Sequence, residues 1–314
     1  MLKLIKNEWV KLWSKKSSWV MLILTLAVIV AMLVGLKTFD KLVNGDEEPT
    51  SWKEQQQMTI EGNKTFLTEE NLTTKEKERL ENEIKIAEYR LKNNVEPPAS
   101  DSTASFLESS VSALSLISLF GVIVAAGIVS FEFGTGTIKM LLTRPIARWK
   151  ILLSKLITTF LFTILLTTVG FALSALLGYV FFDSAGTSLT IQDGKVTEVN
   201  LIGQTLYSYL LSYGDISMSI FFAFMLGTLF SSSSLAIGLT LFITFTSATL
   251  VALLQKYEFI KYFWFSVTDL NGIEKGYTIL PDLTIGFALS VMAVYAIIFL
   301  VISFSVFTKK DITA

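Results

Sequence analysis

The chain has 314 residues, of which 52% are hydrophobic and 17% are charged, and its formal net charge is −1. It contains no Cys and no His, which excludes disulfides, thiolate catalysis, a Ser-His-Asp triad and His-ligated zinc. Soluble domains carry about 25% charged residues, and here the apolar residues are pooled into long runs. We therefore expect an all-α, polytopic membrane protein with six transmembrane helices.

The N-terminal residues 1–18 form a basic amphipathic segment. Apolar residues that include Trp9 and Trp13 recur at near-helical spacing, and Lys residues that include Lys11 take much of the rest. This pattern is typical of a helix that lies in the cytoplasmic interface, with Trp at headgroup depth and Lys against anionic lipid. The alternative is a positively charged stretch that only sets the topology.

Six apolar runs predict the membrane spans, each supplying about 20 residues. The first run lacks an A-x-A site and is too long for the apolar region of a cleaved signal peptide, so we expect it to be retained. The expected spans are residues 17–36, 109–131, 156–182, 210–230, 235–254 and 283–307. The expected connections are an extracellular helical domain at 37–108, a cytoplasmic coupling loop at 132–155, an extracellular loop at 183–209 with a short hairpin around Asp193-Gly194, a serine turn at 231–234, an aromatic re-entrant segment at 255–282 and a cytoplasmic tail at 308–314.

The polar segment between the first two spans contains one well-defined helix. Thr73 and Glu76 form a capping box, and the apolar residues that follow make a single stripe. Glu81 and Lys85 are an i,i+4 ion pair in the favourable order. The stripe needs a partner, which is either a second helix near 52–66 or the same loop of a neighbouring subunit. Capture of a substrate is a further alternative.

The distribution of basic residues orients the chain. Six spans place both termini on the same side as the 132–155 loop, and that side carries 12 Lys and Arg residues against 3 acidic ones. The opposite side carries 14 basic and 24 acidic residues. Because basic residues near span ends favour the cytoplasmic side, we predict a plasma-membrane protein with both termini and the 132–155 loop in the cytoplasm.

The spans are nearly free of the ionisable groups that ion-coupled transporters use as relays. We interpret Asp215 as a residue near the outer start of the fourth span, where an acid complements the helix dipole. A role in coupling is the alternative. Gly170, Ser174 and Gly178 recur every four residues in the third span and predict a face for close helix packing.

The 132–155 loop contains candidate docking residues, which are an acid, a glycine-rich turn, a proline and an arginine: Glu132, Gly134, Thr135, Gly136, Thr137, Pro145 and Arg148. The positive-inside rule is the alternative explanation for its cations, Lys150 and Lys155 included, whereas topology alone does not explain Gly134, Gly136 and Pro145. The chain contains no G-x-x-x-x-G-K-[ST] phosphate loop, so we expect no ATPase activity, no catalytic residue and no metal site in this chain. We expect the loop to contain a short helix that lies on the cytoplasmic face and docks onto a partner.

The motif E-x-G-T-x-T at 132–137, followed by L-L-x-x-P-I-x-R at 141–148 and a Lys before the third span, resembles the first cytoplasmic loop of ABC-2-type permeases. These are the membrane subunits of ATP-binding cassette exporters of the type V fold. The basic N-terminal helix, the six spans, the large loop after the first span and the aromatic segment before the sixth extend the resemblance over the whole chain. The size of the large loop resembles the bacterial branch linked to bacitracin-type and lantibiotic export or immunity.

The resemblance implies two permease chains, identical or related, above two separate cytoplasmic ATPases. Those ATPases would bind the ATP and Mg²⁺, so no cofactor of this chain and no nucleic-acid partner is implied. By position, the acid, the glycine-rich turn, the proline and the arginine of the 132–155 loop would form the ATPase-coupling loop. Closure of the ATPases would tilt the second and fifth spans and export an amphipathic or peptide-like compound.

Two other classes of protein remain open. One is a membrane anchor or immunity protein that sequesters a toxin with residues 37–108 and does not transport it. The other is a membrane enzyme, for which we find no two suitable groups at membrane depth.

Overall fold

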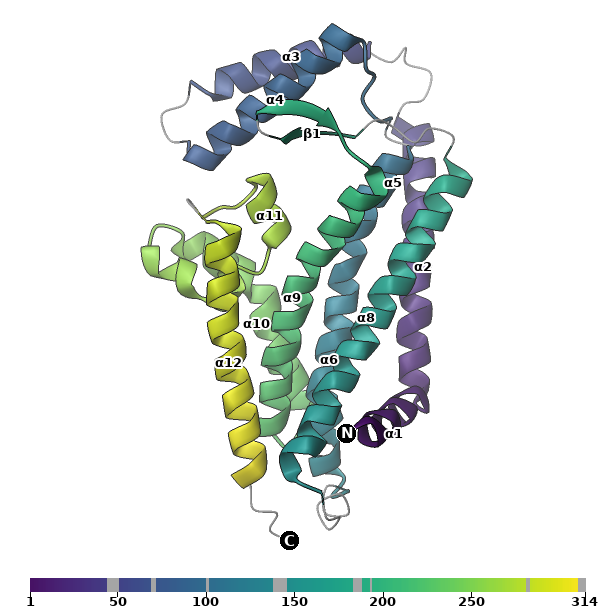
Figure 1. The fold of residues 1–314 in the computed structure, drawn as a ribbon, viewed down its shortest axis with the longest axis vertical. Coiled ribbons are helices and arrows are strands. Elements are labelled where there is room, and N and C mark those ends of the chain that lie inside the picture. Colours follow the sequence, from purple (N-terminus) through teal and green to yellow (C-terminus); the bar gives the residue numbers. More distant parts are fainter. Residues whose placement is uncertain are drawn as a thin grey trace.

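The computed structural model describes residues 1–43, 51–68, 72–99, 102–137, 146–182, 188–192, 194–280 and 283–309. Within these residues, six helices are long and apolar enough to cross a membrane, which confirms the predicted fold class (Figure 1). They are α2 (Lys16–Val43), α5 with η1 and α6 (Thr103–Ser110, Val111–Ala113 and Leu114–Gly134), α8 (Arg148–Phe181), α9 (Leu201–Leu229), α10 (Ser233–Leu254) and α12 (Ile285–Lys309).

The two ends of the helix bundle differ. The α1 end carries α1 (Leu2–Trp13), which lies across the bundle, and the last turn of α12 (Figure 1). The α3–α4 end carries two helices and an antiparallel hairpin, which are α3 (Trp52–Phe66), α4 (Thr74–Asn93), β1 (Leu189–Gln192) and β2 (Lys195–Glu198). Between α10 and α12 lie η2 (Glu258–Tyr262), η3 (Trp264–Ser266) and α11 (Leu270–Lys275).

Helices α6 and α9 form the centre of the bundle and pack along much of their length. The two helices approach closely at Gly227, where an added Cβ would lie 2.5 Å from the carbonyl oxygen of Ala126. By contrast, α2, α10 and α12 are largely unburied and expose large apolar side chains. Apolar helices with an exposed outer face are what a bilayer requires of the periphery of a bundle.

The fourth span begins earlier than we predicted, at Leu201 rather than near residue 210. The side chain of Asn200 caps the helix by accepting a hydrogen bond from the Gly203 amide at 3.1 Å, and such a cap starts a helix before its apolar run. The interpretation of Asp215 as a helix-start residue is therefore wrong. Asp215 lies in the middle of α9, where its carboxylate accepts a hydrogen bond from Ser118 Oγ of α6 at 3.4 Å.

Other boundaries shift by smaller amounts. Helix α8 begins at Arg148, so the end of the predicted 132–155 loop is helical, and the second span begins at Thr103 rather than at residue 109. Helix α1 ends at Trp13, before the predicted residue 18, because Ser18 Oγ donates to the Leu12 carbonyl at 2.7 Å and closes a turn before α2. Residues 138–145 of the predicted coupling loop lie outside the described residues.

The α3–α4 end follows its sequence signals. The Thr73 amide donates to Glu76 Oε2 at 2.8 Å, and the Glu76 amide donates to Thr73 Oγ1 at 3.2 Å, so the predicted capping box is confirmed. Helix α4 packs against α3 of the same loop, the first of the predicted partners, and also contacts the hairpin. Leu80, Ile84 and Ala87 of its apolar stripe are buried. The hairpin also forms, with Leu189 opposite Glu198 and a positive φ of 75° at Gly194.

Candidate functional site

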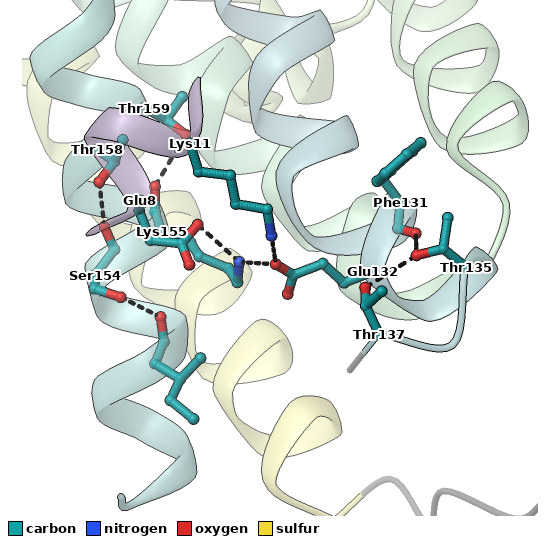
Figure 2. Close-up of polar contacts among 11 residues, drawn as sticks. Glu8, Lys11, Phe131, Glu132, Thr135, Thr137, Ser154, Lys155, Thr158 and Thr159 are labelled. Atoms are coloured by element: carbon teal, nitrogen blue, oxygen red, sulfur yellow. Dashed lines mark hydrogen bonds and ion pairs between the residues drawn. The ribbon is translucent and has the colours of Figure 1, made fainter. Parts of the chain in front are cut away.

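Four charged side chains meet where α1 crosses the ends of α6 and α8 (Figure 2). We call Glu8, Lys11, Glu132 and Lys155 the ionic cluster. Lys155 Nζ lies 2.9 Å from Glu8 Oε2 and 2.8 Å from Glu132 Oε1, and Lys11 donates to the same Glu132 oxygen. The side chain of Lys155 is 0% exposed and that of Glu132 is 1% exposed. Three elements that are distant in the chain therefore meet through charges at the α1 end.

Burial of these charges is tolerated because they neutralise each other. Transfer of one ion into a protein interior costs several kcal/mol, and only close opposite charges with good geometry offset that cost. The ionic cluster holds two positive and two negative groups, and its central Lys155 touches both carboxylates. Removal of one member would leave another charge buried and uncompensated, so the cluster fixes α1 on α6 and α8.

The local sequence of α1 places Glu8 on the buried face. Glu8 and Leu12 are one helical turn apart and are both buried, as the i,i+4 rule requires for one face. Trp13 lies beside them and packs on Trp9, Trp19 and Phe162 of α8, with ring centroids 5.1 to 5.8 Å apart. The predicted interfacial helix is thus also anchored to the bundle by aromatic contacts.

One carboxylate oxygen of the ionic cluster lacks a partner within the described part of the chain. Glu132 Oε2 is buried and makes no hydrogen bond there, although buried polar atoms are nearly always paired. A small hollow beside it is lined by Lys15 and Phe131, among others, and Lys15 Nζ lies 4.9 Å from the centre of the Phe131 ring. Desolvation, and then repulsion by Lys11 and Lys155, lower the pKa of Lys15, which lies between α1 and α2.

The predicted coupling residues lie in two places. Glu132 joins the ionic cluster, and the turn that follows has the predicted geometry: Gly136 has a φ of 71°, which glycine adopts without strain. Thr135 Oγ1 donates to the Phe131 carbonyl at 2.8 Å and lies 3.0 Å from Thr137 Oγ1. Gly134 ends α6, and a Cβ there would lie 3.2 Å from the Ser231 carbonyl oxygen.

Arg148 lies apart from the ionic cluster. Its guanidinium donates to the Thr308 carbonyl at 3.1 Å and so joins the start of α8 to the end of α12. Pro145 lies outside the described residues. Gly170, Ser174 and Gly178 are buried on α8, and the Gly178 carbonyl accepts a hydrogen bond from Thr103 Oγ1 of α5 at 3.1 Å.

Sequence reasoning missed three features of the ionic cluster. Lys11 was assigned to anionic lipid, whereas it donates to Glu132. The positive-inside rule explains Lys155 as a cation at the membrane surface, whereas its side chain is fully buried. Glu8 was not selected, although it is the one acid within residues 1–18. A lone acid on the apolar face of a basic helix was the available signal, because such a charge needs a buried partner.

The six apolar helices, with the amphipathic helix α1 across one end of the bundle, define a multi-pass membrane protein. The chain belongs to a family described as "Protein of unknown function (DUF2705)", which matches residues 76–313. It is 34% identical over 319 residues to "Uncharacterized protein YhcI" of Bacillus subtilis (strain 168), covering 99% of each chain. It is 31% identical over 200 residues to "Uncharacterized membrane protein YdbK" of the same organism, covering 63% of this chain and 78% of that protein.

Proposed function

We propose that the chain is the permease subunit of an ATP-binding cassette transporter. Its α1 end would lie in the cytoplasm and its α3–α4 end outside, in the plasma membrane. A separate ATPase would bind the segment that connects α6 to α8. A second permease chain, identical or related, would complete the pathway. The cargo would be an amphipathic or peptide-like compound that is exported.

The observation that carries this proposal is the position of the ionic cluster. Glu132 lies at the end of α6 and Lys155 lies in the second turn of α8, so their 2.8 Å contact joins the two helices that the 132–155 segment connects. Glu8 and Lys11 add α1 to the same joint. A force applied to the loop would therefore move α1, α6 and α8 together, since separating them would expose unpaired buried charges. A subunit driven by a partner needs such a rigid connection.

The orientation can be tested cleanly because the chain has no cysteine. We would make two single-cysteine variants, Thr137→Cys and Lys85→Cys. Position 137 follows α6 at the α1 end, position 85 lies on α4, and both are exposed. We expect a membrane-impermeant maleimide to label residue 85 in intact cells and residue 137 only after the cells are permeabilised. Labelling of residue 137 in intact cells would contradict the proposed orientation.

The partner can be tested by purifying the tagged chain from its native membrane in mild detergent. We expect a phosphate-loop ATPase to co-purify with the wild type and with Lys92→Glu, a matched charge reversal on the exposed surface of α4. Arg148→Glu should insert normally but retain less ATPase. Absence of any such subunit from the wild-type preparation, or transport by vesicles that contain this chain alone, would refute the proposal.

A further inference from the structure

A cleft at the α3–α4 end is lined by both polar and apolar residues. It lies between α5, α9 and α11 and is open to the outside. Its polar lining includes Ser105, Gln204 and Ser208, and its apolar lining includes Ala104 and Val111. A cleft that offers both kinds of surface suits a ligand with a polar headgroup and an apolar part.

One acid and one base face each other across this cleft. Lys275 Nζ of α11 donates to Glu108 Oε1 of α5 at 2.6 Å. The side chains are 40% and 71% exposed, and exposed ion pairs contribute little to stability. Each charge can therefore exchange its partner for a ligand at small cost. Because the pair is neutral overall, a ligand that engages both side chains needs one positive and one negative group.

The interior of the cleft has further hydrogen-bonding capacity. Ser188 Oγ donates to Gln204 Oε1 at 2.5 Å, which orients the Gln204 side chain so that its amide nitrogen is the remaining donor. Asn271 of α11 donates to the Ser208 carbonyl at 2.9 Å and holds α11 against α9. Hydrogen bonds thus hold the Gln204 side chain and the α11 segment in place beside the exposed ion pair.

Helix α4 holds the segment that carries Lys275. Lys75 Nζ donates to the Ile273 carbonyl at 3.1 Å, and the Arg79 guanidinium lies 4.7 Å from the centre of the Tyr277 ring. Gly276, which lies between Ile273 and Tyr277 in the chain, has a φ of 73°. A Cβ at this position would lie 3.3 Å from the Lys75 carbonyl oxygen. The α3–α4 end therefore sets the position of Lys275, the basic side chain that lines the cleft among the described residues.

We propose that this cleft binds the zwitterionic headgroup of an amphiphile. Glu108 would take the ammonium group, Lys275 would take the phosphate or carboxylate, and the apolar wall would take the start of the hydrocarbon part. The inference rests on the proposed function only in placing the cleft on the outer side of the membrane. The same chemistry occurs in a zwitterionic lipid and in a peptide-like compound with free amino and carboxyl groups.

Native mass spectrometry of the purified full-length chain tests the proposal with three probes. Phosphatidylethanolamine represents the lipid, Nε-lauroyl-lysine represents the peptide-like amphiphile, and phosphatidylglycerol is the anionic control. We expect at least one zwitterionic probe to bind about tenfold more tightly than phosphatidylglycerol. Glu108→Gln and Lys275→Met should each weaken its binding by about tenfold, the effect of losing one charge-assisted hydrogen bond. The probe that binds identifies the source of the headgroup.

Two controls separate binding from folding. Lys92→Met removes an exposed Lys on α4 away from the cleft and should bind like the wild type. The double variant Glu108→Lys with Lys275→Glu keeps one charge of each sign and should recover most of the affinity lost by the single variants. Equal binding of all three probes, or unchanged binding in both single variants, would overturn the proposal. No ATPase takes part, so this result is independent of the partner experiment.

Discussion

The ionic cluster at the α1 end and the Glu108–Lys275 pair at the α3–α4 end use the same chemical groups in opposite environments. Lys155 and Glu132 are almost completely buried, whereas Lys275 and Glu108 are exposed. Buried charges cannot separate without a large loss of free energy, and exposed charges exchange partners readily. The comparison indicates a rigid joint at one end of the bundle and an exchangeable contact at the other.

The largest expected effect follows from removing the central charge of the ionic cluster. Lys155→Met leaves Glu8 without its partner and leaves Glu132 with Lys11 only. We expect the free energy of unfolding to fall by about 3–5 kcal/mol, measured by denaturation of the purified chain in detergent. Lys150→Met, five residues away on the exposed surface, should change it by less than about 1 kcal/mol. Equal stability of the two variants would show that the ionic cluster does not fix α1 on α6 and α8.

Glycine substitutions extend the comparison to packing. A Cβ at Gly227 would lie 2.5 Å from the backbone oxygen of Ala126, whereas one at Gly214 would lie 2.8 Å from the end of the Leu270 side chain. Backbone cannot yield and a side chain can, so Gly227→Ala should destabilise the chain by about 1–3 kcal/mol and Gly214→Ala by less. Thermal denaturation measures both, and the reverse order would contradict the view that α6 and α9 are packed rigidly near the α1 end.

The exposed pair should contribute little to folding. Glu108→Gln and Lys275→Met should each change the free energy of unfolding by less than about 1 kcal/mol, even though each is expected to weaken ligand binding. Denaturation curves recorded without ligand provide the measurement. A loss as large as that of Lys155→Met would remove the distinction between the two ends.

The smallest expected effect concerns pH at the start of α4. Hydrogen bonds from Thr73, first from its amide and then from its hydroxyl, hold the pKa of Glu76 below its ordinary value of about 4.5. The folded state therefore prefers the carboxylate. Its contribution to stability is complete above about pH 4.5 and is lost as the pH falls through the lower folded pKa. Glu76→Gln should show a smaller loss of stability than the wild type between pH 6 and pH 3, and identical profiles would contradict this assignment.

The sequence predicted the features that depend on local patterns. The six spans follow from the length of their apolar runs, the start of α4 follows from Thr73 and Glu76, and the hairpin follows from Asp193-Gly194. The start of α9 was misplaced because the apolar run begins later than the capping residue Asn200. Asp215 was therefore placed at a helix end, whereas it lies at mid-helix beside Ser118.

The ionic cluster could not be predicted in the same way. Lys155 is 147 residues from Glu8 in the chain, and Lys11 is 121 residues from Glu132. Periodicity identifies the face of a helix but not the helix that will cover it, and pairing across such distances depends on tertiary packing. The sequence therefore identified Glu132 as unusual without giving its partners.

Photo-crosslinking in native membranes tests most directly whether a partner pushes on the chain between Thr137 and Ile146. A photoreactive benzoyl-phenylalanine would replace Thr137, and the same residue at Lys85 on α4 would serve as the control. We predict an adduct between position 137 and a phosphate-loop ATPase, and none from position 85. An adduct with such an ATPase at position 85, or its absence at position 137 in cells where the chain is functional, would contradict the account.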